Sequence, residues 1–276
     1  MPSAFSQWAW KRLPYRILIF VVTATVLLTC FEYQRRIATY QYNLAPADKE
    51  TLNELLNVFL SIVEKEKLTY FLYGGSLLGS YRHHDIIPWD DDIDVMIPQS
   101  QAGVLQKAMI NLSEDYQIYT NVHPWKIFKV KSTKIGFFNG LVKYASFPWK
   151  YPFIDLFFYE DQGNALRDNS PYSDNICPFQ KDHVFPLTRR PFFGRMVNVP
   201  RKTESVLKTM YKIKMCETTN LIHSTEIKSL WHTSTDCGHL HKFFPFVHRH
   251  RTEKGINETV EIDGRVISWW LEPKET

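Results

Sequence analysis

Three aspartates spaced two residues apart are the clearest chemical feature of the sequence. Asp90, Asp92 and Asp94 follow a Pro-Trp pair and run into the apolar segment at residues 95–97. In an extended segment the three carboxylates share one face, because successive side chains alternate. Carboxylates held this close repel one another strongly unless a cation neutralises them. Oxygen ligands favour a hard ion, so we expect these three residues to bind Mg²⁺ or Mn²⁺ together with substrate phosphates.

An acidic surface turn without an ion is the alternative explanation for this pattern. The apolar residues directly after the acids argue against it, because they would bury one face of the segment. Asp91 faces the other way, and we expect it to have a structural role.

A glycine-serine turn lies upstream of the aspartates, between a predicted strand and a short predicted helical turn. It consists of Gly74, Gly75 and Ser76. Free N–H groups at the N-terminus of a helix can hold phosphate oxygens. We therefore expect Gly75 and Ser76 to bind substrate, although any tight turn can use these residue types.

Together these segments resemble the signature of the LicD/fukutin family, a branch of the nucleotidyltransferase superfamily. The matching residues are Gly75 to Gly79, Arg82–His83 and Pro88 to Asp94, with looser matches at residues 153–157 and 185–200. The resemblance covers residues 50–215. It implies a nucleotidyltransferase-like mixed sheet flanked by helices.

The resemblance also implies an activity. Members of the family transfer a phosphorylated group, such as ribitol phosphate or phosphocholine, from a CDP-activated donor to a glycan hydroxyl. Asp92 and Asp94 are then the first metal ligands and catalytic residues. Asp155 completes the metal site or acts as base toward the acceptor hydroxyl. Arg82 and His83 are expected to bind substrate, since an arginine fork matches a phosphate.

Several further residues have two explanations each. Lys129 and Lys131 alternate with apolar residues on a predicted strand, so either one reaches the site or both lie on an exposed face. Trp89 either stacks on a base or sugar or packs in the core. Three arginines either bind a glycan phosphate or coat the surface, and we expect them to coat the surface: Arg189, Arg190 and Arg195.

Apolar spacing predicts an α+β domain around one sheet. A helix from Asp48 has apolar residues at i, i+3, i+4 and i+7. Further helices are expected at residues 101–112 and 203–215. The expected strands lie at residues 68–73, 92–97, 116–120, 126–131, 141–144 and 153–158, with a β-like stretch at 189–199 and a loop at 161–182.

An uncharged run of 15 residues near the N-terminus, residues 17–31, predicts one transmembrane helix. With its flanks we take the span as residues 16–33, which is short for a bilayer core that needs roughly 20 residues. Basic residues before it favour a cytoplasmic tail at residues 1–15. A cleavable signal peptide or a buried core helix are the alternatives.

The rest of the chain is expected to lie in the lumen of the secretory pathway. A stem at residues 34–47 leads to a catalytic domain at 48–215, and no fold is assigned to 216–276. The absence of a retrieval signal at the end of the chain favours the membrane of the Golgi over that of the endoplasmic reticulum, with a single-pass type II topology. Asn111 and Asn257 would then be glycosylation acceptors.

The cysteines and histidines of the lumenal part leave two questions open. Among Cys177, Cys216 and Cys237 an oxidising lumen can pair two, and spacing does not say which. Histidines between residues 232 and 250 allow a zinc site, but Cys-x-His-x-His lacks a familiar structural spacing, so a polar, partly ordered tail is expected instead.

Charge argues against a nucleic-acid partner. The formal net charge is +4, and beyond residue 31 the chain carries 30 basic and 29 acidic residues. That part lacks the broad basic footprint of a nucleic-acid binder. The expected partners are a CDP-linked donor, a glycan or glycoprotein acceptor, and the membrane. The alternatives are a catalytically silent relative that binds glycans or scaffolds a partner, and a DxD glycosyltransferase that uses a nucleotide sugar.

Overall fold

The computed structural model describes residues 4–135, 147–170, 178–219, 221–228 and 232–273. The chain divides into two units, Met1–Gln41 and Tyr42–Thr276. The expected strand at residues 141–144 lies outside the described residues, and so does Cys177.

The first unit is dominated by one long helix, α1 (Ala4–Ala38). Within it, residues Ile17–Arg35 are long and apolar enough to cross a membrane, with a mean hydropathy of 1.8. The helix continues through the first part of the expected stem, since it ends at Ala38. Length and composition alone are weak evidence for a span.

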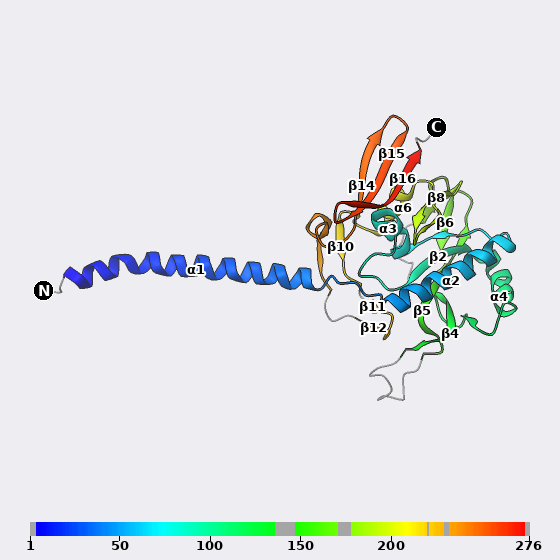
Figure 1. Cartoon of the computed structure of the whole chain (residues 1–276), viewed down its shortest axis with the longest axis horizontal. Helices are drawn as coiled ribbons and strands as arrows, with labels where there is room; N and C mark the ends of the chain where they lie inside the picture. Colours follow the sequence, from blue (N-terminus) through cyan, green and yellow to red (C-terminus); the bar gives the residue numbers. More distant parts are fainter. Residues whose placement is uncertain (1–3, 136–146, 171–177, 220, 229–231, 274–276) are drawn as a thin grey trace. The chain divides into compact units, whose positions relative to one another are not determined.

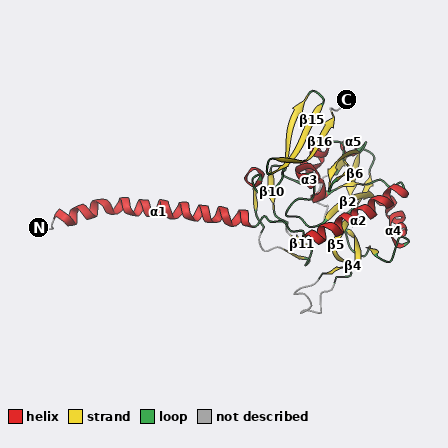
Figure 2. Cartoon of the chain, in the orientation of Figure 1, coloured by secondary structure: helices red, strands yellow, loops and turns green. Residues whose placement is uncertain are grey.

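The second unit is built on a seven-stranded mixed sheet with the path order β1-β2-β5-β4-β3, extended by β6 and β7 (Figures 1 and 2). β2 and β5 are parallel, whereas the other neighbouring pairs in the sheet are antiparallel. The strands are β1 (Phe71–Leu72), β2 (Ile93–Pro98), β3 (Tyr116–Tyr119), β4 (Trp125–Lys134), β5 (Lys150–Asp161), β6 (Ala165–Asp168) and β7 (Phe179–Gln180).

The helix α2 (Pro46–Lys65) packs against β4 and β5 through an apolar stripe. Its buried residues are Leu52, Leu55, Leu56, Phe59, Ile62 and Val63. Spacing of three and four residues puts these side chains on one face, as the sequence predicts. The helix begins two residues earlier than expected, because Pro46 suits the first helical turn.

The helix α3 (Gly74–His83) begins directly after β1 and includes the glycine-serine turn expected before it. Gly74 has φ of +50°, and a Cβ there would lie 2.7 Å from Oδ2 of Asp94. Only glycine avoids both the backbone strain and the contact. Only Tyr73 separates the strand from the helix, and the start of α3 therefore lies against the carboxylate of Asp94 on β2.

The remaining elements of the family-like region differ from expectation in their bounds. α4 (Ala102–Ile110) follows a 3₁₀ turn, and the expected loop at 161–182 contains β6, β7 and α5 (Lys181–Val184). The β-like stretch is a hairpin of β8 (Thr188–Phe192) and β9 (Arg195–Val199). α6 (Thr203–Met210) is shorter than predicted, since the backbone becomes extended at Tyr211.

Residues 216–276, for which no fold was expected, form defined structure where they are described. β10 (Met215–Glu217) pairs with β13 (Ser234–Asp236), and β11 (Leu221–Ile222) pairs with β12 (Ile227–Lys228). A three-stranded antiparallel sheet follows, drawn in orange and red in Figure 1. Its strands are β14 (Val247–Thr252), β15 (Gly255–Ile262) and β16 (Arg265–Pro273).

A buried ion cluster attaches this C-terminal sheet to α3 and β8. Glu258 is completely buried and contacts the side chains of His84, Arg190 and Arg249 at 2.9, 2.5 and 2.8 Å. The prediction that Arg190 coats the surface is therefore wrong. Its side chain is fully buried, because it neutralises a buried carboxylate where the two sheets meet.

Candidate metal and phosphoryl-transfer site

The register of three strands brings two carboxylates and an amine into one row. Asp94 on β2 pairs in register with Asp155 on β5, which in turn pairs with Lys126 on β4. Residues in register on neighbouring strands share one face, so their side chains adjoin. Nζ of Lys126 lies 2.7 Å from Oδ1 of Asp155. The strand order thus assembles a charged row that residue spacing in the sequence does not reveal.

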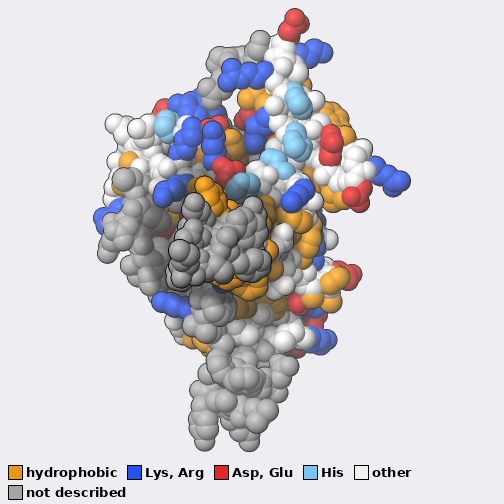
Figure 3. Space-filling model, turned by 90° about the vertical axis from the view of Figure 1, so that its left-hand side faces the viewer, with side chains coloured by type: hydrophobic (Ala, Val, Ile, Leu, Met, Phe, Trp, Pro, Cys, Tyr) orange, Lys and Arg blue, Asp and Glu red, His pale blue; other side chains and the backbone are white. Residues whose placement is uncertain are grey.

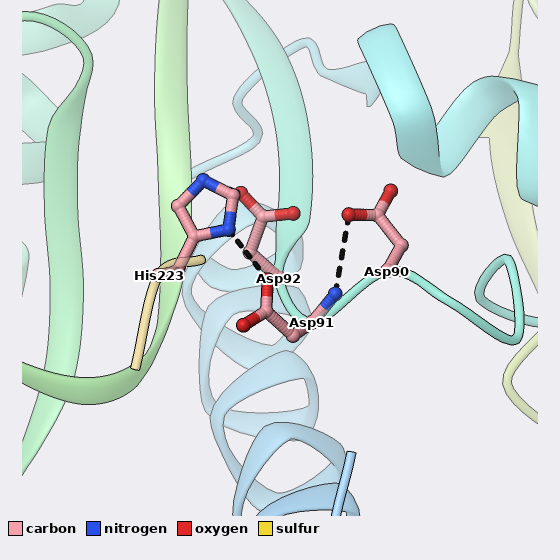
Figure 4. Close-up of side chains that lie close together, drawn as sticks. All are labelled: Asp90, Asp91, Asp92 and His223. Carbon is pink, nitrogen blue, oxygen red and sulfur yellow. Dashed lines mark hydrogen bonds and ion pairs between the residues drawn. The ribbon is translucent and has the colours of Figure 1, made fainter. Parts of the chain in front are cut away.

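The loop before β2 adds three more acids, and Figure 4 shows two of them, Asp91 and Asp92, beside the ring of His223. Nδ1 of His223 lies 2.6 Å from Oδ1 of Asp91, and its Nε2 lies 3.4 Å from Oδ2 of Asp92. Asp90 lies on the other side of Asp91 and accepts a hydrogen bond from its backbone N–H. Asp91 is buried and pairs with His223. Its carboxylate was expected to face away from those of Asp90 and Asp92, but it belongs to the same close group of potential ligands.

Two overlapping sets of side chains could hold a metal ion. One comprises Asp90, Asp91, Asp92 and His223, and the other comprises Asp92, Asp94 and Asp155. In each set the potential ligand atoms lie within 4.8 Å of one another. The second set offers carboxylate oxygens alone, which is the ligand chemistry of a hard divalent cation. Asp92 belongs to both sets.

The carboxylates open onto a cavity of about 770 Å³. Its walls come from the start of α3, the acidic loop, the strands β2 and β5, and the chain after α6. The predicted site residues in the lining are Gly75, Arg82, Asp90, Asp92, Asp94 and Asp155. A concave site with converging charged groups is the form expected of a ligand-binding cavity.

Burial shifts the pKa values of the acids upward. It raises the pKa of Asp90 to about 8, with the Asp92 charge adding to the effect. It raises the pKa of Asp155 to about 7, although Lys126 acts in the opposite direction. Burial and then the charge of Asp92 hold the pKa of Asp94 well above its usual range. Buried like charges produce these shifts, and a bound cation would reverse them.

His223 has the opposite shift. Burial alone would lower the pKa of its ring, but the carboxylates of Asp92 and Asp91 outweigh burial and raise the pKa to about 11. The ring is therefore a buried cation beside the acids. No signal in the sequence pointed to His223, because it lies in the extension to which no fold was assigned.

The glycine-serine segment orients an acid in this structure. The backbone N–H of Gly75 donates to Oδ2 of Asp94 at 2.9 Å, and Oγ of Ser76 accepts from the backbone N–H of Asp94 at 2.8 Å. Gly75 lines the cavity, whereas Ser76 is not among the lining residues. The expectation that both present free groups to a phosphate is corrected to this extent, because Asp94 already uses them.

Arg82 and His83 are adjacent in sequence, but only Arg82 lines the cavity. Arg82 lines the cavity, and its guanidinium donates to the carbonyls of Ile213 and Met215 at 2.6 and 2.7 Å. His83 lies outside the lining, with Nδ1 2.5 Å from the carbonyl of Pro245 and its ring against Phe246. Burial lowers the pKa of His83 to about 3, so the ring is neutral. The ring therefore packs against the C-terminal region and does not line the cavity where substrate contact was predicted.

The lysine that reaches the site is neither of the two expected ones. Lys129 pairs with Glu54 at 2.6 Å and Lys131 with Asp115 at 3.4 Å, both away from the cavity. The lysine that reaches the site is Lys126, which pairs with Asp155. It lies on the same strand as Lys129 and Lys131 but an odd number of residues away from each, so its side chain points to the opposite face of the sheet. Lys212, which follows α6, is a further cation on the cavity wall that sequence reasoning missed.

Trp89 packs in the core, which is one of the two roles considered for it. Its side chain is 3% exposed and packs edge-on against Phe244. Its Nε1 donates to the carbonyl of Glu217 at 2.9 Å. The residue also lines the cavity, so it is a packed wall of the site.

A disulfide joins Cys216 to Cys237 and closes the segment that carries His223. Backbone carbonyls on either side of Cys216 are held by Arg82 and by Trp89. The histidines of the C-terminal region gather on one face in Figure 3, yet no metal-binding group of three side chains occurs there among the described residues.

Comparison with known proteins identifies the family. Residues 67–202 match the family of LicD/FKTN/FKRP nucleotidyltransferase domains. The chain is 28% identical over 170 residues to the ribitol 5-phosphate transferases FKRP of mouse and human, a match that covers 60% of this chain and 32% of each relative. It is 45% identical over 47 residues to the lipopolysaccharide cholinephosphotransferase LicD of Haemophilus influenzae, which is 17% of this chain and 18% of that protein.

These matches define a class of protein, the nucleotidyltransferase domains. Within that class the chain belongs to the LicD/FKTN/FKRP family. It spans about a third of the length of the FKRP relatives. The acids of the site fall inside the matched segment, whereas Lys212 and His223 lie beyond it.

Solved structures give a more distant likeness. The lincosamide antibiotic adenylyltransferase LnuA is 16% identical with a TM-score of 0.37, covering 58% of this chain and 85% of that structure. This likeness is too low to support an inference about substrate. The mixed sheet itself, with β2 and β5 carrying carboxylates, is the architecture that positions the site.

Proposed function

We propose that the protein is a metal-dependent transferase that moves a phosphorylated group, such as ribitol phosphate or phosphocholine, from a CDP-activated donor to a glycan hydroxyl. One observation carries the proposal. Asp90, Asp92, Asp94 and Asp155 converge on a single cavity inside a domain of the LicD/FKTN/FKRP family. Relatives in this family are named as ribitol 5-phosphate and choline phosphate transferases.

A divalent cation, Mg²⁺ or Mn²⁺, fits the oxygen ligands of Asp90, Asp92 and Asp94. When bound, such an ion neutralises the donor phosphates and stabilises the charge that develops on the leaving nucleotide. Asp92 belongs to both carboxylate sets, so it is the residue whose loss disrupts the site most.

Asp155 and Lys126 form the part of the site that β5 and β4 contribute. Asp155 completes the second carboxylate set and lies in register with Asp94. Lys126 is a positioning residue, because its amine holds the Asp155 carboxylate and packs over the ring of Phe153, 3.7 Å from the ring centre. Depending on where the acceptor hydroxyl binds, Asp155 serves as ligand or as base.

Lys212 is the cation that we assign to a substrate phosphate. Arg82, which the sequence favoured, hydrogen-bonds backbone carbonyls on both sides of Lys214 and so shapes the wall that presents Lys212. Lys212 is exposed on that wall, and its side chain makes no ion pair with the described residues. An ammonium group there can contact an anionic substrate as a mobile point charge.

Membrane attachment completes the proposal. The helix at Ile17–Arg35 would anchor the protein as a single-pass type II protein of the Golgi or the endoplasmic reticulum, with the catalytic unit in the lumen. The disulfide Cys216–Cys237 supports an oxidising compartment. Asn111, exposed at the end of α4, is then accessible for glycosylation.

A thermal-shift panel tests the donor assignment. The full-length chain in detergent is heated with CDP, UDP or GDP, each with and without Mg²⁺ or Mn²⁺. The proposal expects stabilisation by CDP that requires the metal and is lost in Asp92→Asn. A preference for UDP would instead support a nucleotide-sugar glycosyltransferase, and no shift with any nucleotide would contradict the donor site.

A further inference from the structure

A second cavity, of about 690 Å³, lies between the N-terminal end of α6 and the C-terminal sheet. It is nearly as large as the acidic cavity. Most of its lining comes from residues 203–272, which lie beyond the segment matched to the family. We call it the α6–β16 cavity. The metal site and the proposed donor site do not account for it.

Shared lining residues on one face of α6 lead from the acidic cavity to the α6–β16 cavity. A smaller hollow of about 210 Å³ shares Thr209 with the acidic cavity and Ser205 with the α6–β16 cavity. Ser205 and Thr209 are four residues apart, so they lie on the same helix face. The three hollows therefore follow each other along α6, whose eight residues span about 10 Å at 1.5 Å per residue.

The lining of the α6–β16 cavity combines an aromatic ring with charged and hydroxyl groups. Trp270 is half-buried, and the guanidinium of Arg190 packs 4.5 Å from the centre of its ring. Thr188 and Ser205 contribute hydroxyl groups. An aromatic surface beside hydrogen-bonding side chains suits a ligand that is apolar on one side and polar around its edge, as a sugar ring is.

The charges of the lining favour an acidic ligand. Both lining acids already have cationic neighbours, Glu204 at 2.7 Å from Lys208 and Glu272 at 3.5 Å from Arg190. Arg251 is exposed on the cavity wall, and its side chain has no ion pair or hydrogen bond with the described residues. Its guanidinium can therefore take a carboxylate, sulfate or phosphate as a two-point partner.

We propose that the α6–β16 cavity binds an acidic oligosaccharide, the part of the acceptor glycan remote from the hydroxyl that is modified. This rests on the proposed function, since the linked hollows lead from the acidic cavity. Trp270 packs against a sugar ring and Arg251 contacts the acidic group. The acceptor is thus selected by the C-terminal extension, outside the domain that carries the carboxylates.

Calorimetric titration of the full-length chain in detergent tests the proposal, with EDTA present and without donor. The probes are the tetrasaccharides of chondroitin 4-sulfate and hyaluronan, which are acidic, and chitotetraose, a neutral control of the same length. We expect at least one acidic tetrasaccharide to bind more tightly than chitotetraose. Arg251→Ala and Trp270→Ala should each weaken that binding by about tenfold or more, the value of one charge-assisted contact.

Two residues outside the cavity lining provide controls of the same residue type. Trp269 is adjacent to Trp270 on β16 but is 70% exposed and lies outside the cavity, so Trp269→Ala should leave binding unchanged. Arg265 also lies outside the cavity lining, so Arg265→Ala should leave binding unchanged and is the control for Arg251→Ala. Because Trp270 also packs on Arg190, its variant requires an intact circular dichroism spectrum, and Arg251→Ala carries the test if folding is lost.

Three outcomes would overturn the proposal: no binding of either acidic tetrasaccharide at millimolar concentration, equal binding of chitotetraose, or unchanged binding in the folded Arg251→Ala variant. The outcome is separable from that of the donor site, because Asp92→Asn should bind the acidic tetrasaccharide as the parent does. Absence of transfer with this binding intact would count against the proposed function alone.

Discussion

The start of α3 lies so close to the acids that a methyl group added at Gly75 should weaken metal binding while leaving the stability of the fold nearly unchanged. A Cβ on Gly75 would lie 2.5 Å from Oδ2 of Asp90 and 3.4 Å from Oδ2 of Asp94. The first contact is too short, so the carboxylate of Asp90 must turn away. The side chain can do so without moving the backbone. Gly75→Ala therefore changes the metal site while the fold persists.

The magnitudes follow from the same contacts. Gly75 is helical and has no positive φ, so alanine gains up to about 1 kcal/mol of helix propensity that offsets the strain on Asp90. The free energy of unfolding should change by less than about 1 kcal/mol. Displacing one ligand from its orientation should reduce metal affinity by about 10- to 100-fold. Mn²⁺ titration by calorimetry and urea unfolding measure the two quantities on one preparation.

Substitutions at two other glycines serve as comparisons for Gly75→Ala. No atom lies within 4 Å of a Cβ on Gly103, so Gly103→Ala in α4 should leave Mn²⁺ affinity unchanged. A Cβ on Gly79 would meet the backbone carbonyl of Asp85 at 2.5 Å, and that backbone cannot turn aside as a side chain can. Gly79→Ala should destabilise the fold by about 1–3 kcal/mol. Unchanged Mn²⁺ affinity in a folded Gly75→Ala protein would refute the assignment of Asp90.

Three further predictions concern the surroundings of the site. Replacing Cys216 and Cys237 by serine should lower the free energy of unfolding by about 2–4 kcal/mol, measured in urea. Lys126→Met leaves Asp155 buried without its cation and should cost about 3 kcal/mol in the same assay. Burial alone would raise the pKa of Glu258, but His84 and then the arginines lower it to about 2. The ionised carboxylate therefore stabilises the fold above pH 4.5, and this stabilisation is lost as the pH falls toward 2. Glu258→Gln should abolish this acid-dependent loss of stability, measured by unfolding at several pH values.

Each of these predictions has a control and a contradicting result. Dithiothreitol should reproduce the serine variant, whereas Cys30→Ser should have no effect, because Cys30 is a free thiol. Lys129→Met removes an exposed pair and should cost at most about 1 kcal/mol, so equal effects at Lys126 would count against a buried ion pair. Glu253→Gln, at an exposed turn, should leave the acid dependence intact.

Local spacing predicted that the acids lie together, because these potential metal ligands are close together in the sequence. The two-residue period placed Asp90, Asp92 and Asp94 together, and each lines the same cavity. The partner strand with Asp155 followed from the family resemblance. Its pairing with Asp94 depends on a parallel register between distant segments, which no local pattern encodes.

The errors came from long-range packing. His83 looks like a substrate ligand beside Arg82, but the fold turns its ring toward Phe246 of the C-terminal extension. Arg190 looks like a surface residue until the buried Glu258 is placed beside it. His223 reaches Asp91 across 132 positions of sequence. In each case one of the two residues lies in residues 216–276, where the sequence pattern assigned no elements.

The central claim is that Asp92 serves a metal-dependent transfer from a CDP-activated donor. The most direct test measures CMP released from CDP-ribitol or CDP-choline by the full-length protein, with a mixed glycoprotein acceptor and Mg²⁺ or Mn²⁺. We predict metal-dependent release that Asp92→Asn abolishes and that Asp115→Asn, an exposed acid paired with Lys131, retains. Equal release by Asp92→Asn, or release unaffected by EDTA, would contradict the account.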